Sequence, residues 1–247
     1  MAVYVYDGEW EGLMTALYQA LSDDTPPTDI QPAGAVQPTF FDTVIHVNAD
    51  PDTVTRLAAG IRRRVSDMAF HNVLYAYLSE IEGAPMAIYR YLELGFEIGR
   101  TVDRHMADDR VLPVLRMVDK VGAETHRLLG LVRFRQTTDG IYYSSISPDG
   151  QVIGLIAPHF AERMADMDWI IHDVRRGLAA LGRRGEWQLT TLPYIEAEFD
   201  EDELRYQEAW KTYYRQVAIA TRANPRLRRN YMPVRYWKHL IEDPYRT

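Results

Sequence analysis

The sequence predicts an α+β fold: a mostly helical single domain, residues 1–247, around a small central antiparallel β-sheet over about residues 131–191, with N-terminal strands of which the first lies in or near that sheet. Two observations predict this class. Apolar residues recur at a helical period before and after that stretch, whereas within it the period changes to about two. With 247 residues, of which 47% are hydrophobic and 26% charged, the chain is long enough to bury a substantial core.

In the N-terminal half, turn and cap residues separate the expected elements. Residues 3–6 alternate as in a strand and stop at the turn dipeptide Asp7-Gly8. Asp50 and Pro51 stand in the preferred order of a helix cap and first turn. The expected elements are a strand at 3–6, a helix after residue 8, a Pro-rich loop at 23–39, a strand at 40–47 and a helical part at about 50–129.

The sheet part is predicted from its turns. Thr137-Thr138-Asp139-Gly140, between the alternating residues 131–135 and 141–146, is typical of a β-hairpin. A second turn follows at residues 147–150. The further expected elements are strands at 152–156, 169–172 and 187–191, a short helix from Pro158 through Arg163, and a basic helical C-terminal part, 201–247, with a helix to about Ala220 and two short helices beginning at Pro225 and Pro233.

Composition excludes several function classes. The chain contains no cysteine, which excludes disulfides, thiolate nucleophiles, zinc–thiolate sites and iron–sulfur clusters within it. Its apolar stretches are shorter than the roughly 18–20 residues of a membrane-spanning helix. Residues 1–7 lack the regions of a secretory signal, so we expect a cytoplasmic protein with no membrane partner. Phosphate-binding glycine motifs and Gly-x-Ser-x-Gly are absent, which disfavours P-loop and serine-hydrolase chemistry.

Charge is distributed unevenly along the chain. The net charge is −7, yet residues 204–247 contain ten Lys and Arg against three Asp and Glu. Because the Debye length is about 8 Å at physiological salt, such a local positive segment acts almost independently of the acidic remainder. The asymmetry therefore points to an anionic partner for the C-terminal part.

Basic and aromatic side chains alternate in residues 222–238. This pattern is typical of a nucleic-acid interface, where cations neutralise phosphates and rings stack on exposed bases. The alternative is that the rings anchor the core and the arginines are solvated or paired. The DNA-binding candidates in this segment are Arg222, Arg226, Arg228, Arg229, Arg235, Tyr236, Trp237 and Lys238.

A second basic set lies in the expected sheet part. Period-two geometry puts Arg133 and Arg135 on one face of their strand. If that face is open it forms a platform for DNA; the alternative is that the arginines serve solubility. Arg163, at the end of the expected short helix, is the third DNA-binding candidate outside the C-terminal segment.

Three histidines are candidates for acid–base or metal chemistry. His126 lies near the end of a predicted helix, His159 stands at helical spacing from Glu162, and His172 is followed by Asp173 at the end of a predicted strand. If they converge, His126, His159, His172 and Asp173 form a catalytic site. None of the spacings is a strong metal motif, so the alternative is that each is hydrogen-bonded locally, and we expect no bound metal or cofactor.

Five segments together carry a resemblance to one protein family, and they keep its order along nearly the whole chain. They are Tyr4-Val5-Tyr6-Asp7-Gly8 with Glu11-Gly12-Leu13, Glu124-x-His126-Arg127-x-x-Gly130-x-x-Arg133-Phe134, Pro158-His159-Phe160-x-x-Arg163, Trp169-Ile170-Ile171-His172-Asp173 and Met232-Pro233-x-Arg235-Tyr236-Trp237-Lys238. The chain resembles the bacterial DNA metabolism or DNA repair proteins built on a domain of unknown function. Members of that family are usually encoded beside a radical S-adenosylmethionine (SAM) protein, and many are fused to a uracil-DNA glycosylase domain.

The resemblance implies DNA as the substrate, a radical SAM iron–sulfur protein as partner and a uracil-DNA glycosylase as a further partner. It implies no catalytic residue. Since the sequence ends at Thr247 after the basic segment, we expect the stand-alone form without glycosylase activity. The lack of cysteine agrees with a cluster held wholly by the partner.

Three functions remain open on the sequence. The first is a non-catalytic subunit that binds single-stranded or damaged DNA and presents it to the radical enzyme. The second is an enzyme that uses the histidine set for acid–base or hydrolytic chemistry on nucleotides or DNA bases. The third is a protein-interaction scaffold whose arginines bind an acidic surface. Convergence of the histidines would favour the enzyme, and their separation would favour the binding functions.

Overall fold

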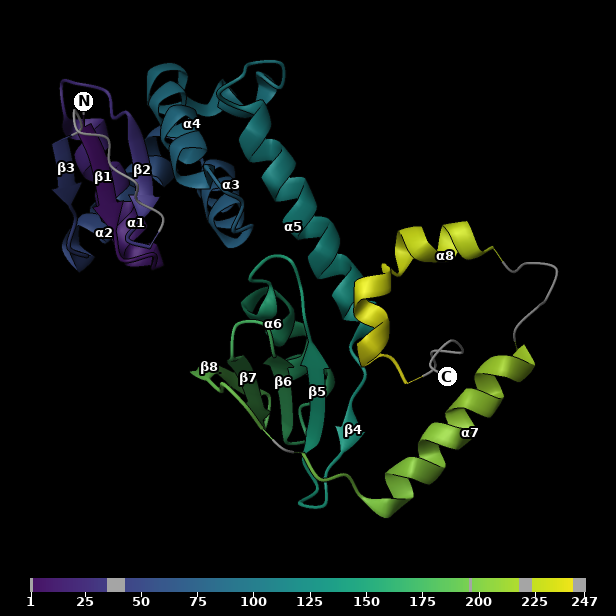
Figure 1. Ribbon diagram of the computed structural model, residues 1–247. Helices are drawn as coiled ribbons and strands as arrows, with labels where there is room; N and C mark the ends of the chain where they lie inside the picture. The colour runs from purple at the N-terminus through teal and green to yellow at the C-terminus, as the bar shows by residue number, and fades with distance from the viewer. Residues whose placement is uncertain (1, 35–42, 196, 218–223, 242–247) are drawn as a thin grey trace. The chain divides into compact units, whose positions relative to one another are not determined.

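The computed structural model describes residues 2–34, 43–195, 197–217 and 224–241, and it has an α+β fold, as predicted (Figure 1). By its internal contacts the chain divides into two compact units, residues 1–122 and 123–247. The boundary falls inside one long helix, α5 (Leu112–Leu131). Folding of the whole chain as a single domain stays a prediction, because it concerns cooperative unfolding rather than compactness.

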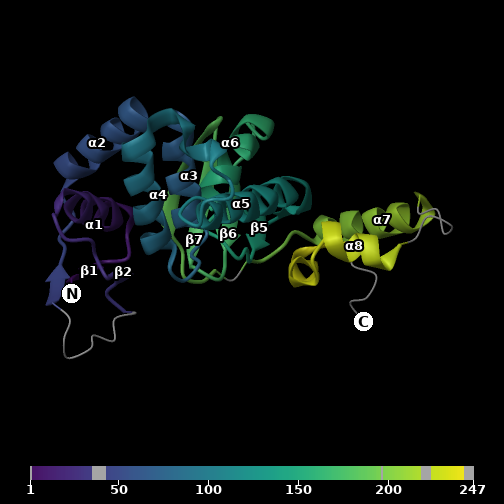
Figure 2. The same ribbon diagram turned by 90° about the horizontal axis from the view of Figure 1, so that it is seen from above.

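The N-terminal unit combines a small parallel sheet with a group of helices. The sheet has the strand order β2-β1-β3, and helix α1 packs against β1 and β2 (Figure 2). Its core includes the buried side chains of Tyr4, Leu13 and Leu17. The elements are β1 (Ala2–Tyr6), α1 (Trp10–Ser22), β2 (Asp29–Pro32), β3 (Thr43–His46), α2 (Pro51–Gly60), the π-helix η1 (Ile61–Val65), α3 (Asp67–Leu78), α4 (Ala84–Ile98) and the 3-10 helix η2 (Gly99–Arg104).

Local signals in this unit are confirmed, but the sheet is a different one from that expected. Asp50 caps α2, because its carboxylate accepts a hydrogen bond from the Asp52 amide at 3.3 Å. Strand β1, which the sequence places in or near the central sheet, belongs instead to a separate parallel sheet. Its residues 3–6 are all buried, which is typical of parallel strands covered on both faces. Residues 40–42 of the expected strand lie outside the described residues, and β2 was expected to be loop.

The C-terminal unit contains a five-stranded sheet with the order β4-β5-β6-β7-β8. Three of its four strand pairs are antiparallel, and the pair β5–β6 is parallel because the connection between these strands is a helical crossover, α6. The elements are β4 (Arg135–Gln136), β5 (Tyr142–Ile146), α6 (Ile153–Arg163), β6 (Trp169–Asp173), β7 (Leu178–Arg183), β8 (Glu186–Thr191), α7 (Glu201–Val217), α8 (Pro225–Tyr231) and the 3-10 helix η4 (Val234–His239).

Two strand predictions in this unit were wrong, and β7 was not predicted. Residues 153–156 open α6, with Ile153, Ile156 and Phe160 buried at helical spacing, rather than forming a strand. The expected strand at 131–135 is reduced to Arg135 and Gln136, because α5 continues to residue 131. An apolar run of four or five residues suits a buried strand and a buried helical turn equally well, which explains the first error.

One face of the five-stranded sheet is covered by α6. The Phe160 ring of α6 lies 6.5 Å from the ring of Trp169 on β6, and Trp169 crosses Gly182 on the neighbouring strand. Any Cβ at position 182 would overlap the Trp169 ring, so glycine is required there. Because side chains alternate along β6, His172 and Ile170 lie on the opposite face of the sheet. No helix within the described residues is both long and apolar enough to cross a membrane.

Candidate functional site

A cationic cavity lies on the sheet face opposite α6. Arg135 of β4 pairs with Tyr143 of β5, and Ser145 lies two residues further along β5, so all three side chains share this face. The cavity has a volume of about 350 Å³. Strands β4 and β5, helix α7 and the C-terminal segment around η4 supply its lining, which consists of Arg135, Ser145, Gln207, Lys211, Lys238, His239, Leu240 and Ile241.

The charged side chains that line this cavity are all positive. Arg135, Lys211 and Lys238 line it, and no carboxylate stands among its described lining residues. The Lys211 ammonium also lies 2.7 Å from a carboxylate oxygen of Glu208, which offsets part of its charge. The Arg135 guanidinium stacks on the Phe199 ring at 3.9 Å from the centroid, which fixes it in place. Clustered cations with a serine and a glutamine as further donors make this a site for an anion such as a phosphate.

His239 is held in the wall of the cavity by one serine of β5 and one serine of the loop that follows it. Its Nδ1 lies 2.9 Å from Ser145 Oγ, and its Nε2 lies 3.0 Å from Ser147 Oγ. Both ring nitrogens are therefore hydrogen-bonded, and the ring plane is set by β5 and by the loop that follows it. This triad of side chains ties η4 to the sheet.

Glu124 of α5 is the second anchor of the C-terminal segment. Its carboxylate is buried and accepts hydrogen bonds from the Gly150 amide at 2.8 Å, the Asp149 amide at 3.0 Å, the Tyr236 hydroxyl and the Arg235 guanidinium at 3.2 Å. Burial by itself raises the pKa of Glu124, but these four donors outweigh it, and the net pKa is lowered. Glu124 is therefore an ionised, fully engaged acceptor that joins α5, the 147–150 loop and η4.

The 147–150 loop is held from its other side by the end of β6. Arg176 donates hydrogen bonds to the Pro148 carbonyl at 3.2 Å and to the Asp149 carbonyl at 2.7 Å. The same guanidinium lies 2.7 Å from the fully buried carboxylate of Asp173. Glu124 thus binds the amides of this loop and Arg176 binds its carbonyls. These contacts keep the loop, and with it Ser147, in one conformation.

The four residues predicted to be catalytic are not brought together by any described contact. His126 and His159 are exposed on α5 and α6, whereas His172 is buried on β6. His172 Nδ1 lies 2.9 Å from the Tyr143 hydroxyl, and burial lowers the pKa of His172. Asp173 is occupied by Arg176. The described residues contain no group of three or more His, Asp and Glu side chains placed to hold a metal ion.

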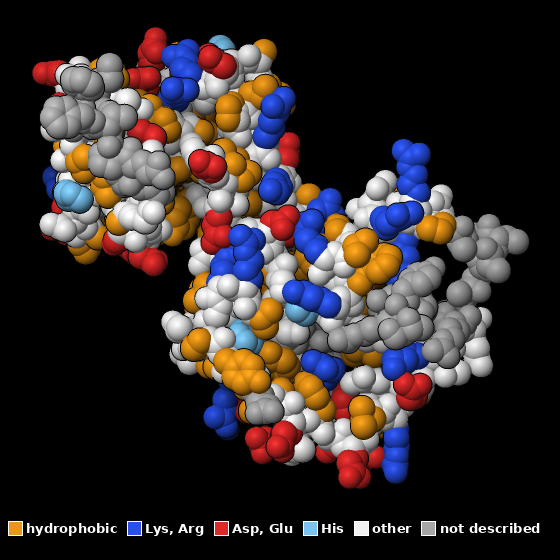
Figure 3. All heavy atoms as spheres, in the orientation of Figure 1, with side chains coloured by type: hydrophobic (Ala, Val, Ile, Leu, Met, Phe, Trp, Pro, Cys, Tyr) orange, Lys and Arg blue, Asp and Glu red, His pale blue; other side chains and the backbone are white. Residues whose placement is uncertain are grey.

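The predicted DNA-binding residues fall into four groups: residues that line the cavity, residues with local structural contacts, exposed residues, and one residue outside the described part of the chain. Arg135 and Lys238 line the cationic cavity. Several others have local structural contacts: Tyr236 is 2% exposed and donates to Glu124, and the Trp237 ring lies under the Arg228 guanidinium at 4.8 Å. Arg235 also contacts Glu124, and Arg133 donates to the Gly130 carbonyl at 2.8 Å. The exposed candidates are Arg163, Arg226 and Arg229. Arg222 lies outside the described residues. Figure 3 shows Lys and Arg side chains over α8 and Asp and Glu near the start of α7.

Sequence reasoning missed Ser145, Gln207, Lys211 and His239. Two signals were present: His239 directly follows the candidate Lys238, and Gln207 and Lys211 stand at i, i+4 on one helix. No local signal indicates that these residues meet β5, because that contact joins segments about 90 positions apart.

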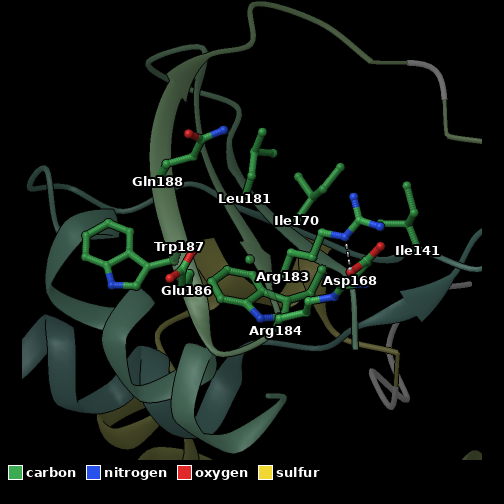
Figure 4. A pocket seen from close by; sticks show the side chains of 11 residues that line it. Ile141, Asp168, Ile170, Leu181, Arg183, Arg184, Glu186, Trp187 and Gln188 are labelled. Atoms are coloured by element: carbon green, nitrogen blue, oxygen red, sulfur yellow. Dashed lines mark ion pairs between the residues drawn. The ribbon is translucent and has the colours of Figure 1, made fainter. Parts of the chain in front are cut away.

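A second, more open pocket of about 600 Å³ is lined mainly by residues of β6, β7 and β8 in the same sheet (Figure 4). Ile170, Leu181 and Gln188 project side by side into it from three adjacent strands, whereas Trp187 points away. At its rim Arg183 lies 3.5 Å from the Asp168 carboxylate. Two arginines, Arg183 and Arg184, and two carboxylates, Asp168 and Glu186, line this pocket, so its charged residues are of both signs, unlike those of the first cavity.

The cavity and its anchors both lie within the part of the chain that matches a known family. No curated protein matches the sequence. The sequence model of the DUF4130 family, a domain of unknown function, matches residues 82–242, which include Glu124, the five-stranded sheet and the entire described cavity lining. Because the match extends over more than half of the 247 residues, the chain belongs to the DUF4130 family.

Proposed function

We propose that this chain binds single-stranded or distorted DNA, with a phosphate group held in the cationic cavity. The observation that carries the proposal is the lining itself: Arg135, Lys211 and Lys238 face one cavity that has no carboxylate among its described lining residues. Lys and Arg side chains bind phosphates by direct contact and by counterion release. The C-terminal charge asymmetry supports the same partner.

Exposed rings on α7 support a preference for unpaired bases. Tyr206, Trp210 and Tyr213 are 72%, 43% and 55% exposed, and they stand at i, i+4 and i+7 on one side of the helix. Trp210 immediately precedes Lys211, which lines the cavity. Rings beside a phosphate site stack bases that are not paired in a duplex. These rings, rather than the buried Tyr236, are the stacking residues of the proposal.

A salt titration of DNA affinity tests the proposal. The double variant Arg135→Gln, Lys238→Gln removes two of the three cations that line the cavity. Each phosphate contact on a single strand contributes about 0.7 to the slope of log K against log salt, so we expect the slope to flatten by about 1.4. The measurement is fluorescence anisotropy of a short labelled single strand, with the matching duplex as comparison, over a range of salt concentrations.

The matched control is Lys120→Gln, which removes an exposed cation of α5 outside the cavity. It should leave the slope unchanged, and circular dichroism should show that all variants are folded. If the double variant binds as the parent does at every salt concentration, the cavity is not the DNA site. The cations would then serve an acidic protein surface, the scaffold function set out above.

The role in DNA repair and the pairing with a radical SAM protein form the finer part of the proposal. Their support is the resemblance of the motifs, together with the absence of cysteine from the chain. In this arrangement the chain holds damaged or modified DNA while the partner supplies the iron–sulfur chemistry. Co-purification of the two proteins, with and without a single-stranded oligonucleotide, tests it: a partner that does not associate under either condition rejects the pairing.

A further inference from the structure

The side chains around His239 have the geometry of an activated nucleophile. Such sites place a hydroxyl within hydrogen-bond reach of a base, and a third group orients the base. Ser145 Oγ lies 2.9 Å from His239 Nδ1, and Ser147 Oγ lies 3.0 Å from His239 Nε2. Only Ser145 of the two serines lines the cationic cavity. This assigns the nucleophile to Ser145 and the orienting group to Ser147.

We propose that the cavity is a phosphoryl-transfer site in which Ser145 attacks a phosphate ester and His239 acts as its base. The inference rests on the proposed function, since the cavity has to hold the phosphate. In the tautomer that the reaction requires, His239 Nδ1 accepts the Ser145 hydroxyl hydrogen and Nε2–H donates to Ser147. Arg135, Lys211 and Lys238 offset the charge that develops on the non-bridging phosphate oxygens.

The reaction balances with water as the sole co-reactant. In the first step a bond forms between Ser145 Oγ and phosphorus, and the bond from phosphorus to the ester oxygen breaks. The Ser145 proton passes to His239 Nδ1 and from there to the leaving alcohol. In the second step water attacks phosphorus, its proton passes to His239, and the bond to Ser145 Oγ breaks, which returns the proton to the serine and releases the phosphate.

The residues that line the cavity indicate which class of phosphate ester it accepts. The polar lining of the cavity suits the anionic phosphate, while Leu240 and Ile241 are its apolar lining residues and suit the ester group. A phosphodiester in a single strand and a small aryl phosphodiester both present this combination. Bis(4-nitrophenyl) phosphate is therefore a probe of the chemistry that is independent of DNA binding.

The experiment looks for a phosphoserine intermediate. The whole chain is incubated with bis(4-nitrophenyl) phosphate or with a single-stranded oligonucleotide, quenched in acid, and analysed by mass spectrometry of the intact chain and its peptides. We expect an adduct on the peptide that contains Ser145. Ser145→Ala should abolish the adduct and lower nitrophenol release by roughly 1,000-fold or more, and His239→Ala should lower release by roughly 100-fold or more.

Ser144→Ala is the matched control, because Ser144 is the neighbouring serine of β5 and points to the opposite face of the sheet. It should keep the adduct. The absence of an adduct in the parent, or release that persists in Ser145→Ala, overturns the inference and leaves His239 as a structural tie between η4 and β5. The DNA affinity of the parent, measured in parallel, separates the two proposals: DNA binding without an adduct rejects only the phosphoryl transfer, and an adduct from bis(4-nitrophenyl) phosphate without DNA binding rejects only the DNA function.

Discussion

Loss of the Glu124 carboxylate should destabilise the C-terminal unit strongly. Its hydrogen bonds from the Gly150 amide and the Tyr236 hydroxyl are fully buried, whereas those from the Asp149 amide and Arg235 are partly solvated. A buried donor left without an acceptor costs about 1–3 kcal/mol, so Glu124→Ala should lower the free energy of unfolding by about 2–6 kcal/mol. Glu124→Gln keeps one acceptor oxygen and should cost about half as much.

The pH dependence of this loss gives an independent check. The folded-state pKa of Glu124 is lowered, so its contribution is fully present above the ordinary glutamate pKa near 4.3 and is lost as pH falls through the folded pKa. The difference between parent and Glu124→Gln should therefore be constant near neutral pH and shrink in acid. Urea unfolding followed by circular dichroism at several pH values measures it.

The control for this prediction is Glu162→Gln, which neutralises an exposed glutamate on α6 and should change the unfolding free energy by less than about 0.5 kcal/mol. The reasoning is refuted if Glu124→Ala costs no more than this control. It is also refuted if the difference between parent and Glu124→Gln stays constant as pH falls well below 4.3.

Three further changes test the packing and the proposed interface. Gly182→Ala forces a methyl group into a buried tryptophan ring and should cost about 1–3 kcal/mol in urea unfolding, whereas Gly154→Ala, with its nearest neighbour 3.7 Å away, should be tolerated. Asp173→Asn breaks a buried ion pair and should cost about 3–5 kcal/mol; Asp168→Asn breaks an exposed one and should cost less than about 1 kcal/mol. Trp210→Ala should weaken single-strand binding by about 1–3 kcal/mol in anisotropy titrations while circular dichroism stays unchanged; equal affinity would remove α7 from the interface.

Local chemistry accounts for the elements that the sequence predicts well. Asp50 and Pro51 mark the start of α2, and Gly140, with φ of +80°, sits in the turn between β4 and β5 as the hairpin pattern requires. Pro225 opens α8 in the same way, with Asn224 as its cap. These signals depend on neighbouring residues, so one sequence is enough to find them.

The sequence predicts the pairing of the strands and the orientation of the side chains less well. Residues 152–156 are apolar in a run that suits either a strand or a helix, and burial against the sheet selected the helix. The strand at 3–6 is predicted correctly, yet its position in a separate parallel sheet depends on β2 and β3. Strand pairing depends on residues that are far apart in the sequence, so a single sequence predicts it poorly.

The sequence by itself determined the α+β class, the starts of α1, α2, α7 and α8, the lack of thiol chemistry and the positive C-terminal segment, because composition, period and capping are properties of neighbouring residues. It named Arg135 and Lys238 as binding candidates but could not join them. Only the tertiary structure brought these cations to one cavity with Ser145 and His239, and buried Tyr236 against Glu124. The physical reason is that side chains more than 90 positions apart meet only after the strands have paired and the C-terminal segment has packed on the sheet, so no local pattern contains their contact.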